Sequence, residues 1–343
     1  MKKQYINFLK FLSIIFVICI HLMSKCWNTI GVNTNTFKVL TFIDIILLVC
    51  VPIFVMCSGN IFLNRKDSYK KMIFKYALKI YLIFILFNSL YKLADITIYE
   101  HEVISIKTII NILKESLLLK NIYHLWYLKI VIAMYVITQL LKYFLNIKNE
   151  YIDHILLLVL LLIVKVSPIL ITNKIYLQIM GVFGFMLYYY LGYYLDKYNH
   201  KSLKYLFIPL FIICYYYTYT KTINSSILIN SASTDHMQYQ SYNIMFISMF
   251  IFILVRSFKD KFEKEKFKKL LSFESVHNFN IYLVHGFVIG FLSYTKIINI
   301  YSYNHIYTLF IYVILVFTLS LISSIIYIKL KKILLNMIKK SYT

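Results

Sequence analysis

The first hydrophobic stretch of the chain, residues 6–23, carries two ionisable side chains, Lys10 and His21. Because they are eleven residues apart, an α-helix places them within about 20° of each other on one face and about 16 Å apart along it. A polar group in hydrocarbon costs several kcal/mol unless it faces a partner or water. The pair therefore predicts one of two things. Either Lys10 extends to the inner membrane surface and His21 bonds to a neighbouring helix, or the cation holds an anionic ligand while the imidazole handles a proton.

Two further residues extend this chemistry. Asp44 lies in the next hydrophobic stretch, at a depth similar to that of His21, where a carboxylate could fix the tautomer of the imidazole and raise its basicity. Helix rotation leaves that pairing open. His285 is a second imidazole in an apolar segment, and we expect it about two turns in from the cytoplasm.

A mixed polar and aromatic segment opens a later hydrophobic stretch with His124, Trp126 and Lys129. Trp and Tyr are common at membrane interfaces, so the segment could be an interfacial anchor. It could equally be the mouth of an acceptor site, where Trp126 stacks on a sugar and His124 bonds its hydroxyls. Lys129, one turn deeper, needs a partner or an anionic ligand.

Basic residues gather before and within the third hydrophobic stretch. Lys71, Lys75 and Lys79 share one face of the expected helix, and Arg65 precedes them. They are either ordinary charges of an inner loop or a cationic funnel for a phosphorylated cytoplasmic ligand.

The composition is that of an integral membrane protein. Hydrophobic residues make up 60% of the 343 residues and charged ones only 15%, and the mean hydropathy is +0.71. Soluble domains keep about a quarter of their residues charged. The net charge of +23 lies next to hydrophobic stretches, where it sets topology and meets anionic lipids, so we do not expect nucleic-acid binding. The five cysteines have no disulfide or metal-ligand spacing, and we predict no metal site.

The elements that must position these residues are membrane helices. We predict an all-α, polytopic membrane bundle of about ten transmembrane helices, forming one domain over residues 1–343 with no separate soluble domain. The expected spans are 5–24, 38–61, 73–93, 124–142, 151–167, 175–195, 203–220, 241–257, 278–295 and 305–328. Most lysines and arginines fall in segments that are cytoplasmic when both termini are cytoplasmic, which fixes the orientation.

At these residues the chain resembles the acyltransferase 3 family of integral membrane acyltransferases. Lys10 and His21 match its basic residue, ten-residue gap and histidine. Residues 51–59 (VPIFVMCSG), 124–128 (HLWYL) and 281–285 (IYLVH) are similar to its other motifs, in the same order. Lys10 stands where arginine is commoner in the family, which keeps the charge and loses the bidentate geometry. Asp44 belongs to no motif of the family.

The resemblance implies a membrane O-acyltransferase. It would move an acyl group, acetyl in the simplest case, from cytoplasmic acyl-coenzyme A to a hydroxyl of a cell-surface polysaccharide or its lipid-linked precursor. His21 would be the general base or an acyl carrier. Our candidates for donor binding are Lys10, Arg65, Lys71, Lys75 and Lys79, and those for the acceptor site or cavity lining are His124, Trp126, Lys129 and His285.

The expected surroundings follow from the same resemblance. Acyl-coenzyme A would be a co-substrate, with no tightly bound cofactor. Expected partners are membrane lipids, the glycan acceptor and other proteins of polysaccharide synthesis, in a bacterial cytoplasmic membrane. The competing class is a transporter or flippase of a lipid-linked sugar, which would also use intramembrane histidine and lysine. The sequence has no inverted repeat and no matching pair of Gly/Pro-broken spans, which argues against that class.

Overall fold

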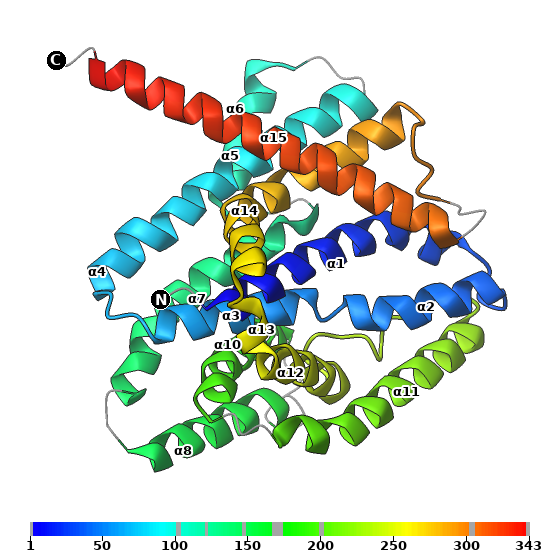
Figure 1. Cartoon of the computed structure of the whole chain (residues 1–343). Helices are drawn as coiled ribbons and strands as arrows, with labels where there is room; N and C mark the ends of the chain where they lie inside the picture. The colour runs from blue at the N-terminus through cyan, green and yellow to red at the C-terminus, as the bar shows by residue number, and fades with distance from the viewer. Residues whose placement is uncertain are drawn as a thin grey trace. The chain divides into compact units, whose positions relative to one another are not determined.

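The structure is a computed structural model, and it describes residues 3–100, 104–120, 123–145, 149–166, 174–198, 202–301 and 306–340. Throughout these residues the chain forms helices and connecting turns, with no strand (Figure 1). The predicted all-α class is therefore confirmed.

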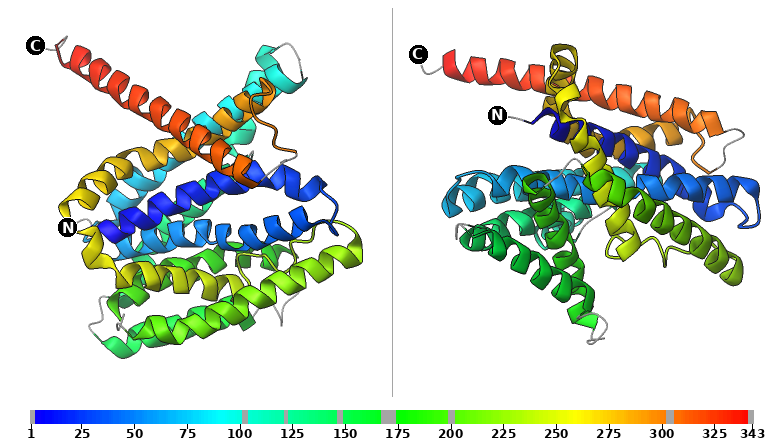
Figure 2. Two further views of the ribbon diagram at one scale, coloured as in Figure 1. Left: turned by 45° about the vertical axis from the view of Figure 1, so that its right-hand side comes forward. Right: turned by 60° about the horizontal axis from the view of Figure 1, so that its bottom comes forward.

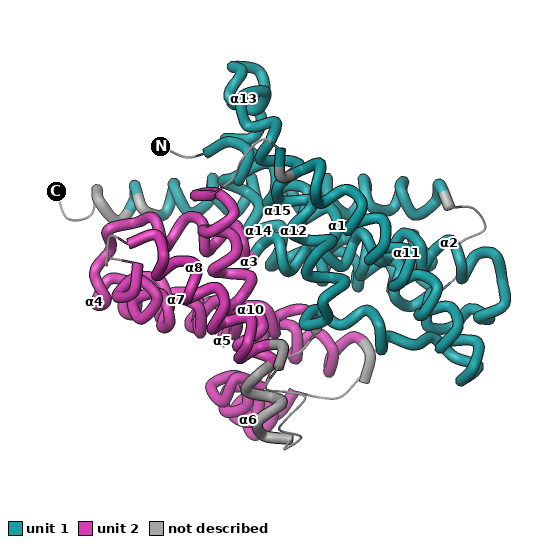
Figure 3. Tube along the Cα trace, turned by 90° about the horizontal axis from the view of Figure 1, so that it is seen from below, with its two compact units in different colours: residues 1–54, 200–343 teal, residues 55–199 magenta. Residues whose placement is uncertain are grey.

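The chain divides into two compact units, which Figure 3 colours separately. The single domain over 1–343 stays a prediction. Helix α3 contributes its first residues to unit 1 and the rest to unit 2. Unit 1, residues 1–54 and 200–343, contains α1 (Gln4–Thr29), α2 (Asn35–Leu47), the start of α3 (Cys50–Leu63), α11 (Leu203–Ile229), α12 (Tyr242–Ser257), α13 (Lys259–Phe262), α14 (Glu265–Tyr294) and α15 (Ile306–Lys340).

Unit 2, residues 55–199, holds the rest of α3 and the helices that follow it in the chain. These are α4 (Tyr69–Lys71), η1 (Met72–Ala77), α5 (Leu78–Asp95), η2 (Ile96–Glu100), α6 (Ile106–Leu117), η3 (Tyr123–Leu125), α7 (Trp126–Leu145), α8 (Glu150–Leu161), η4 (Leu162–Val166) and α10 (Lys174–Lys197). Segments η1, η2 and η4 are π-helical, whereas η3 is a 3₁₀ turn.

Within the described residues, five segments are long and apolar enough to cross a membrane. They are Gln4–Thr29, Asn35–Leu63, Tyr69–Ile98, Trp126–Leu145 and Tyr307–Leu334. The shorter apolar helix Tyr242–Ser257 falls below that length. By the length and composition of these helices, the chain is a multi-pass membrane protein. The count of ten spans and the cytoplasmic termini stay predictions.

Each of the ten predicted spans falls on helix as far as the described residues reach, but several boundaries differ, among them the end of α15, which runs to Lys340 where 328 was expected. The span expected at 38–61 is broken at Leu48 and Val49, between α2 and α3. Pro52 explains the break, because its ring would clash with the carbonyl four residues earlier in a continuous helix. Helix α11 runs past the expected end at 220 to Ile229, and α14 begins at Glu265, thirteen residues before the expected start at 278.

In unit 1, α1 packs against α2, α14 and α15. Figure 2 shows α1 and α2 side by side in dark and lighter blue, antiparallel and joined by a short turn. Trp27 fixes this hairpin, since its Nε1 donates to Thr41 Oγ1 at 2.9 Å and its ring stacks on Phe37 at 5.6 Å. Thr34 caps α2 by accepting from the backbone N–H of Phe37.

In unit 2, α3 and α10 approach closely at two glycines. A Cβ on Gly59 would lie 1.7 Å from the Tyr189 carbonyl oxygen, and one on Gly192 would lie 1.9 Å from the Met56 carbonyl oxygen. Asn60 Nδ2 donates to the Gly192 carbonyl at 3.1 Å. Only glycine allows the two backbones to pack this closely.

Helices α8 and α10 are joined by a buried carboxylate. Asp153 accepts from Lys197 Nζ and from the Tyr198 hydroxyl, each at 2.6 Å. The Tyr190 hydroxyl donates to the Asp153 carbonyl at 3.0 Å. This buried charge is therefore both paired and hydrogen-bonded, as burial requires.

Candidate active site

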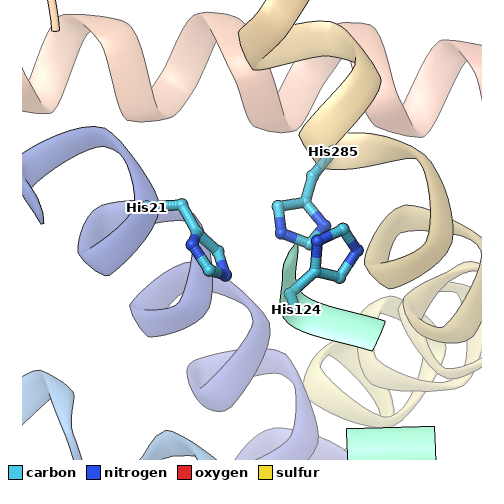
Figure 4. A group of neighbouring side chains, drawn as sticks. All are labelled: His21, His124 and His285. Atoms are coloured by element: carbon cyan, nitrogen blue, oxygen red, sulfur yellow. The ribbon is translucent and has the colours of Figure 1, made fainter. Parts of the chain in front are cut away.

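Two imidazoles meet in unit 1. His21 projects from α1 and His285 from α14, and their ring centroids lie 5.3 Å apart at an interplanar angle of 33° (Figure 4). His285 is fully buried and His21 is half-buried. His124, also drawn in Figure 4, belongs to unit 2 and is described with that unit.

The register of α1 and α14 explains this meeting. Near their first turns, Gln4 Nε2 donates to Ser272 Oγ at 3.5 Å, and seventeen residues further along α1 the two histidines face each other. The helices therefore run in the same direction. His285 consequently lies level with His21, which corrects our expectation that it would be only two turns from the cytoplasmic end. The error came from the late start that we predicted for α14.

The hydrogen bonds of His285 define its tautomer. Its Nδ1 lies 2.7 Å from the Tyr282 carbonyl oxygen and 3.3 Å from that of Ile281, one turn earlier in α14. A carbonyl only accepts, so Nδ1 carries the proton and, in the neutral ring, Nε2 carries the lone pair. An Nε2 in this state can accept a proton from a hydroxyl, which is the chemistry of a general base.

Lys10 lies on the N-terminal part of the α1 face that carries His21. Both residues are in α1, and both are half-buried. Because the helix is regular between them, the predicted axial separation of about 16 Å applies. The structure thus keeps a cation and an imidazole on one stripe of one helix.

Asp44 is on α2, which packs against α1. Its Oδ1 is buried and accepts no hydrogen bond from the residues that the structure describes. The pairing with His21 that we considered is therefore not formed through this oxygen. Depth alone could not predict this, because it does not specify the rotation of α2 about its axis.

Two polar residues of α14 escaped the sequence analysis. Glu274 and Asn278 are each 6% exposed, and both share the face that carries His285. Glu274 precedes His285 by eleven residues, as Lys10 precedes His21, so two parallel helices repeat the same polar spacing. This spacing was visible in the sequence, but Glu274 lay outside the expected span.

In unit 2, Arg65 is held by aromatic rings at the end of α3. Its guanidinium lies 5.0 Å from the centre of the Phe62 ring and 6.0 Å from that of Tyr76. Lys142 of α7 donates to the Arg65 carbonyl, although only 8% of Lys142 is exposed. Cation–π contacts fix the position of a guanidinium without neutralising it, so Arg65 keeps its charge for an anion.

The lysines of the predicted funnel differ from one another. Lys71 pairs with Asp67, whereas Lys75 and Lys79 are exposed. Residues 72–77, which include Lys75, form a π-helical turn between the short helix α4 and α5. The role of these lysines in donor binding stays a prediction.

The segment that begins with His124 packs inside unit 2. His124 is buried in the η3 turn, with its ring edge-on to Tyr91 at 5.3 Å. Trp126 is the first residue of α7, and its ring lies 5.9 Å from that of Phe185 on α10. Trp126 and Lys129 are half-buried, which leaves each with accessible surface for a ligand.

Comparisons with known proteins agree with the motifs. A family model described as an acyltransferase domain matches residues 3–329, so the match runs through both units. No curated protein and no solved structure matches the chain.

Proposed function

This chain belongs to the acyltransferase 3 family, and from that premise we propose that it transfers an acyl group from cytoplasmic acyl-coenzyme A to a hydroxyl of a cell-surface polysaccharide or its lipid-linked precursor. Acetyl is the simplest acyl group for this role. We place the enzyme in a bacterial cytoplasmic membrane, with ten spans and both termini cytoplasmic, because the lysine and arginine distribution favours that orientation.

The observation that carries the proposal is that His21, whose ring lies next to that of His285, shares one face of α1 with the Lys10 ammonium. In acyl-coenzyme A, thirteen bonds separate the thioester sulfur from the nearer phosphorus, about 16 Å in an extended chain. Lys10 and His21 are about 16 Å apart along α1. A donor whose phosphates lie near Lys10 would therefore present its thioester to His21 and His285.

The reaction needs one proton acceptor at the imidazole pair. A histidine Nε2 takes the proton of the acceptor hydroxyl, and the oxygen attacks the thioester carbonyl carbon. The C–S bond then breaks, the sulfur leaves as thiolate, and the imidazolium returns its proton to the sulfur. The products are the O-acyl ester and free coenzyme A. The two-step variant, in which the imidazole first carries the acyl group, uses the same atoms.

Two measurements test this proposal. Purified protein with acetyl-coenzyme A and a glycan extract from the same cells should release free thiol and label the glycan. The masses of surface glycans from cells with and without the gene should differ by one or more acyl groups. Thiol release that needs no protein, together with identical glycan masses, would overturn the proposal.

A further inference from the structure

Asn278 is a buried polar residue to which the proposed reaction assigns no role. Its side chain is 6% exposed, and both Oδ1 and Nδ2 are buried without a hydrogen-bond partner among the described residues. Leaving a buried donor or acceptor unsatisfied costs about 1–3 kcal/mol, and most such groups in proteins have partners. An amide with both ends unsatisfied therefore indicates a ligand.

The position of Asn278 points toward the imidazole pair. It precedes His285 by seven residues, which places it within about 20° on the same face of α14 and about 10.5 Å further in. The adjacent polar residues face α15 instead, since His277 Nδ1 and Asn280 Nδ2 contact Ser324 Oγ at 2.9 and 3.0 Å. Asn278 is thus separated from the α15 contacts and aligned with His285.

The chemistry of Asn278 matches a secondary amide. A primary amide offers one carbonyl acceptor and two N–H donors, so it can accept from an amide N–H and donate to an amide carbonyl at once. The pantetheine arm of acyl-coenzyme A contains two secondary amides. The nitrogen of the second amide is seven bonds from the sulfur, about 9 Å in an extended chain. That distance fits the axial distance from His285 to Asn278.

We infer that Asn278 binds the second amide of the pantetheine arm and so sets the depth of the thioester at the imidazole pair. The inference rests on the proposed function, because it takes acyl-coenzyme A as the donor. A competing explanation of the unsatisfied Asn278 amide is a partner within α14 itself. Glu274 lies four residues before Asn278 with its Oε2 also buried and without a partner among the described residues, so a side-chain rotation could pair the two.

The test compares Asn278→Leu with Asn280→Leu in the full-length protein. The control has the same residue type on the same helix and contacts α15. Titration calorimetry with coenzyme A should show about tenfold weaker binding for Asn278→Leu, because one or two hydrogen bonds are lost. Asn280→Leu should change the affinity less than about twofold. Removal of the unsatisfied amide should leave the melting temperature of Asn278→Leu equal to or above that of wild type.

Truncated ligands locate the contact. Pantetheine has both amides and no diphosphate, so it should show the same loss as coenzyme A. N-acetylcysteamine has only the first amide, so it should compete equally well for wild type and Asn278→Leu. Unchanged coenzyme A affinity with a lowered melting temperature would overturn the inference in favour of the internal pair. Equal losses for pantetheine and N-acetylcysteamine would also overturn it. A wild-type protein that binds neither coenzyme A nor pantetheine would instead overturn the proposed function.

Discussion

His21 and His285 are 264 residues apart in the chain, and yet their rings lie 5.3 Å from centre to centre. A single acceptor hydroxyl placed between them can reach either ring. The two residues are therefore candidates for one proton-transfer unit, in which replacing either ring removes part of the same function.

His21→Gln should abolish glycan acylation. Glutamine keeps hydrogen bonding but cannot cycle a proton, and a general base typically contributes about 100- to 10,000-fold. The measurement is thiol release from acetyl-coenzyme A by purified protein, at matched amounts of inserted protein. Activity above about a tenth of wild type would show that His21 is structural.

His285→Gln should cause a loss of similar size. Its place level with His21, with Nδ1 bonded to the Tyr282 carbonyl, gives its Nε2 the same access to the hydroxyl. The same thiol assay checks this, with Asn280→Leu as a control on α14. A much milder loss than that of His21→Gln would assign proton transfer to His21 alone.

Gly59→Ala and Gly192→Ala should each destabilise the protein. A methyl group at either position would overlap a carbonyl oxygen of the facing helix, at 1.7 and 1.9 Å. Overpacking of this kind costs about 1–3 kcal/mol or more. Gly181→Ala on α10 is the matched control, because nothing lies within 4 Å of its added Cβ and alanine favours a helix. Melting temperatures in detergent should fall for the first two variants and stay level or rise for the third.

Asp67 provides a test at acidic pH. The Lys71 ammonium that bonds to the Asp67 carboxylate lowers the pKa of this group below its usual 3.8. The stabilisation is therefore present above pH 3.8 and is lost as the pH falls through the lowered pKa. Asp67→Asn should lower stability slightly at pH 7, because solvent screens the exposed Lys71 ammonium, and the difference should vanish at strongly acid pH. A constant difference at every pH would contradict this origin.

Reporter insertions test the orientation. Helix α11 ends at Ile229 and α12 begins at Tyr242, so an insertion near Thr234 should be external. The turn that ends at Lys264 is rich in lysine, so an insertion there should be cytoplasmic. The reverse result at either place would contradict both the topology and the inner position of Lys10.

The helices could be predicted because long apolar runs with few Gly and Pro have one stable form in a membrane. The break before Pro52 was missed, because a proline only disfavours a continuous helix, and α11 continues through Pro209. The late start assigned to α14 had a different cause. Residues 265–277 are polar, and hydropathy separates them from the span, although the backbone continues as one helix.

The candidate site was only partly predictable. Lys10 and His21 lie in one continuous helix, so spacing alone placed them on one face. The meeting of His21 with His285 depends on the register between α1 and α14, which no local pattern specifies. Asp44 illustrates the same limit, because its depth in the span does not specify which way α2 directs its side chain.

The π-helical turn at Met72–Ala77 has a consequence for comparing this chain with its relatives. A turn closed by i→i+5 bonds holds one residue more than an α-helical turn. A relative that is α-helical throughout this segment is expected to be one residue shorter here, so an alignment needs a single-residue gap between positions 72 and 77. Without that gap, every position of α5 would be matched to one rotated by about 100° around the helix axis. Lipid-facing residues of one protein would then be compared with buried residues of the other.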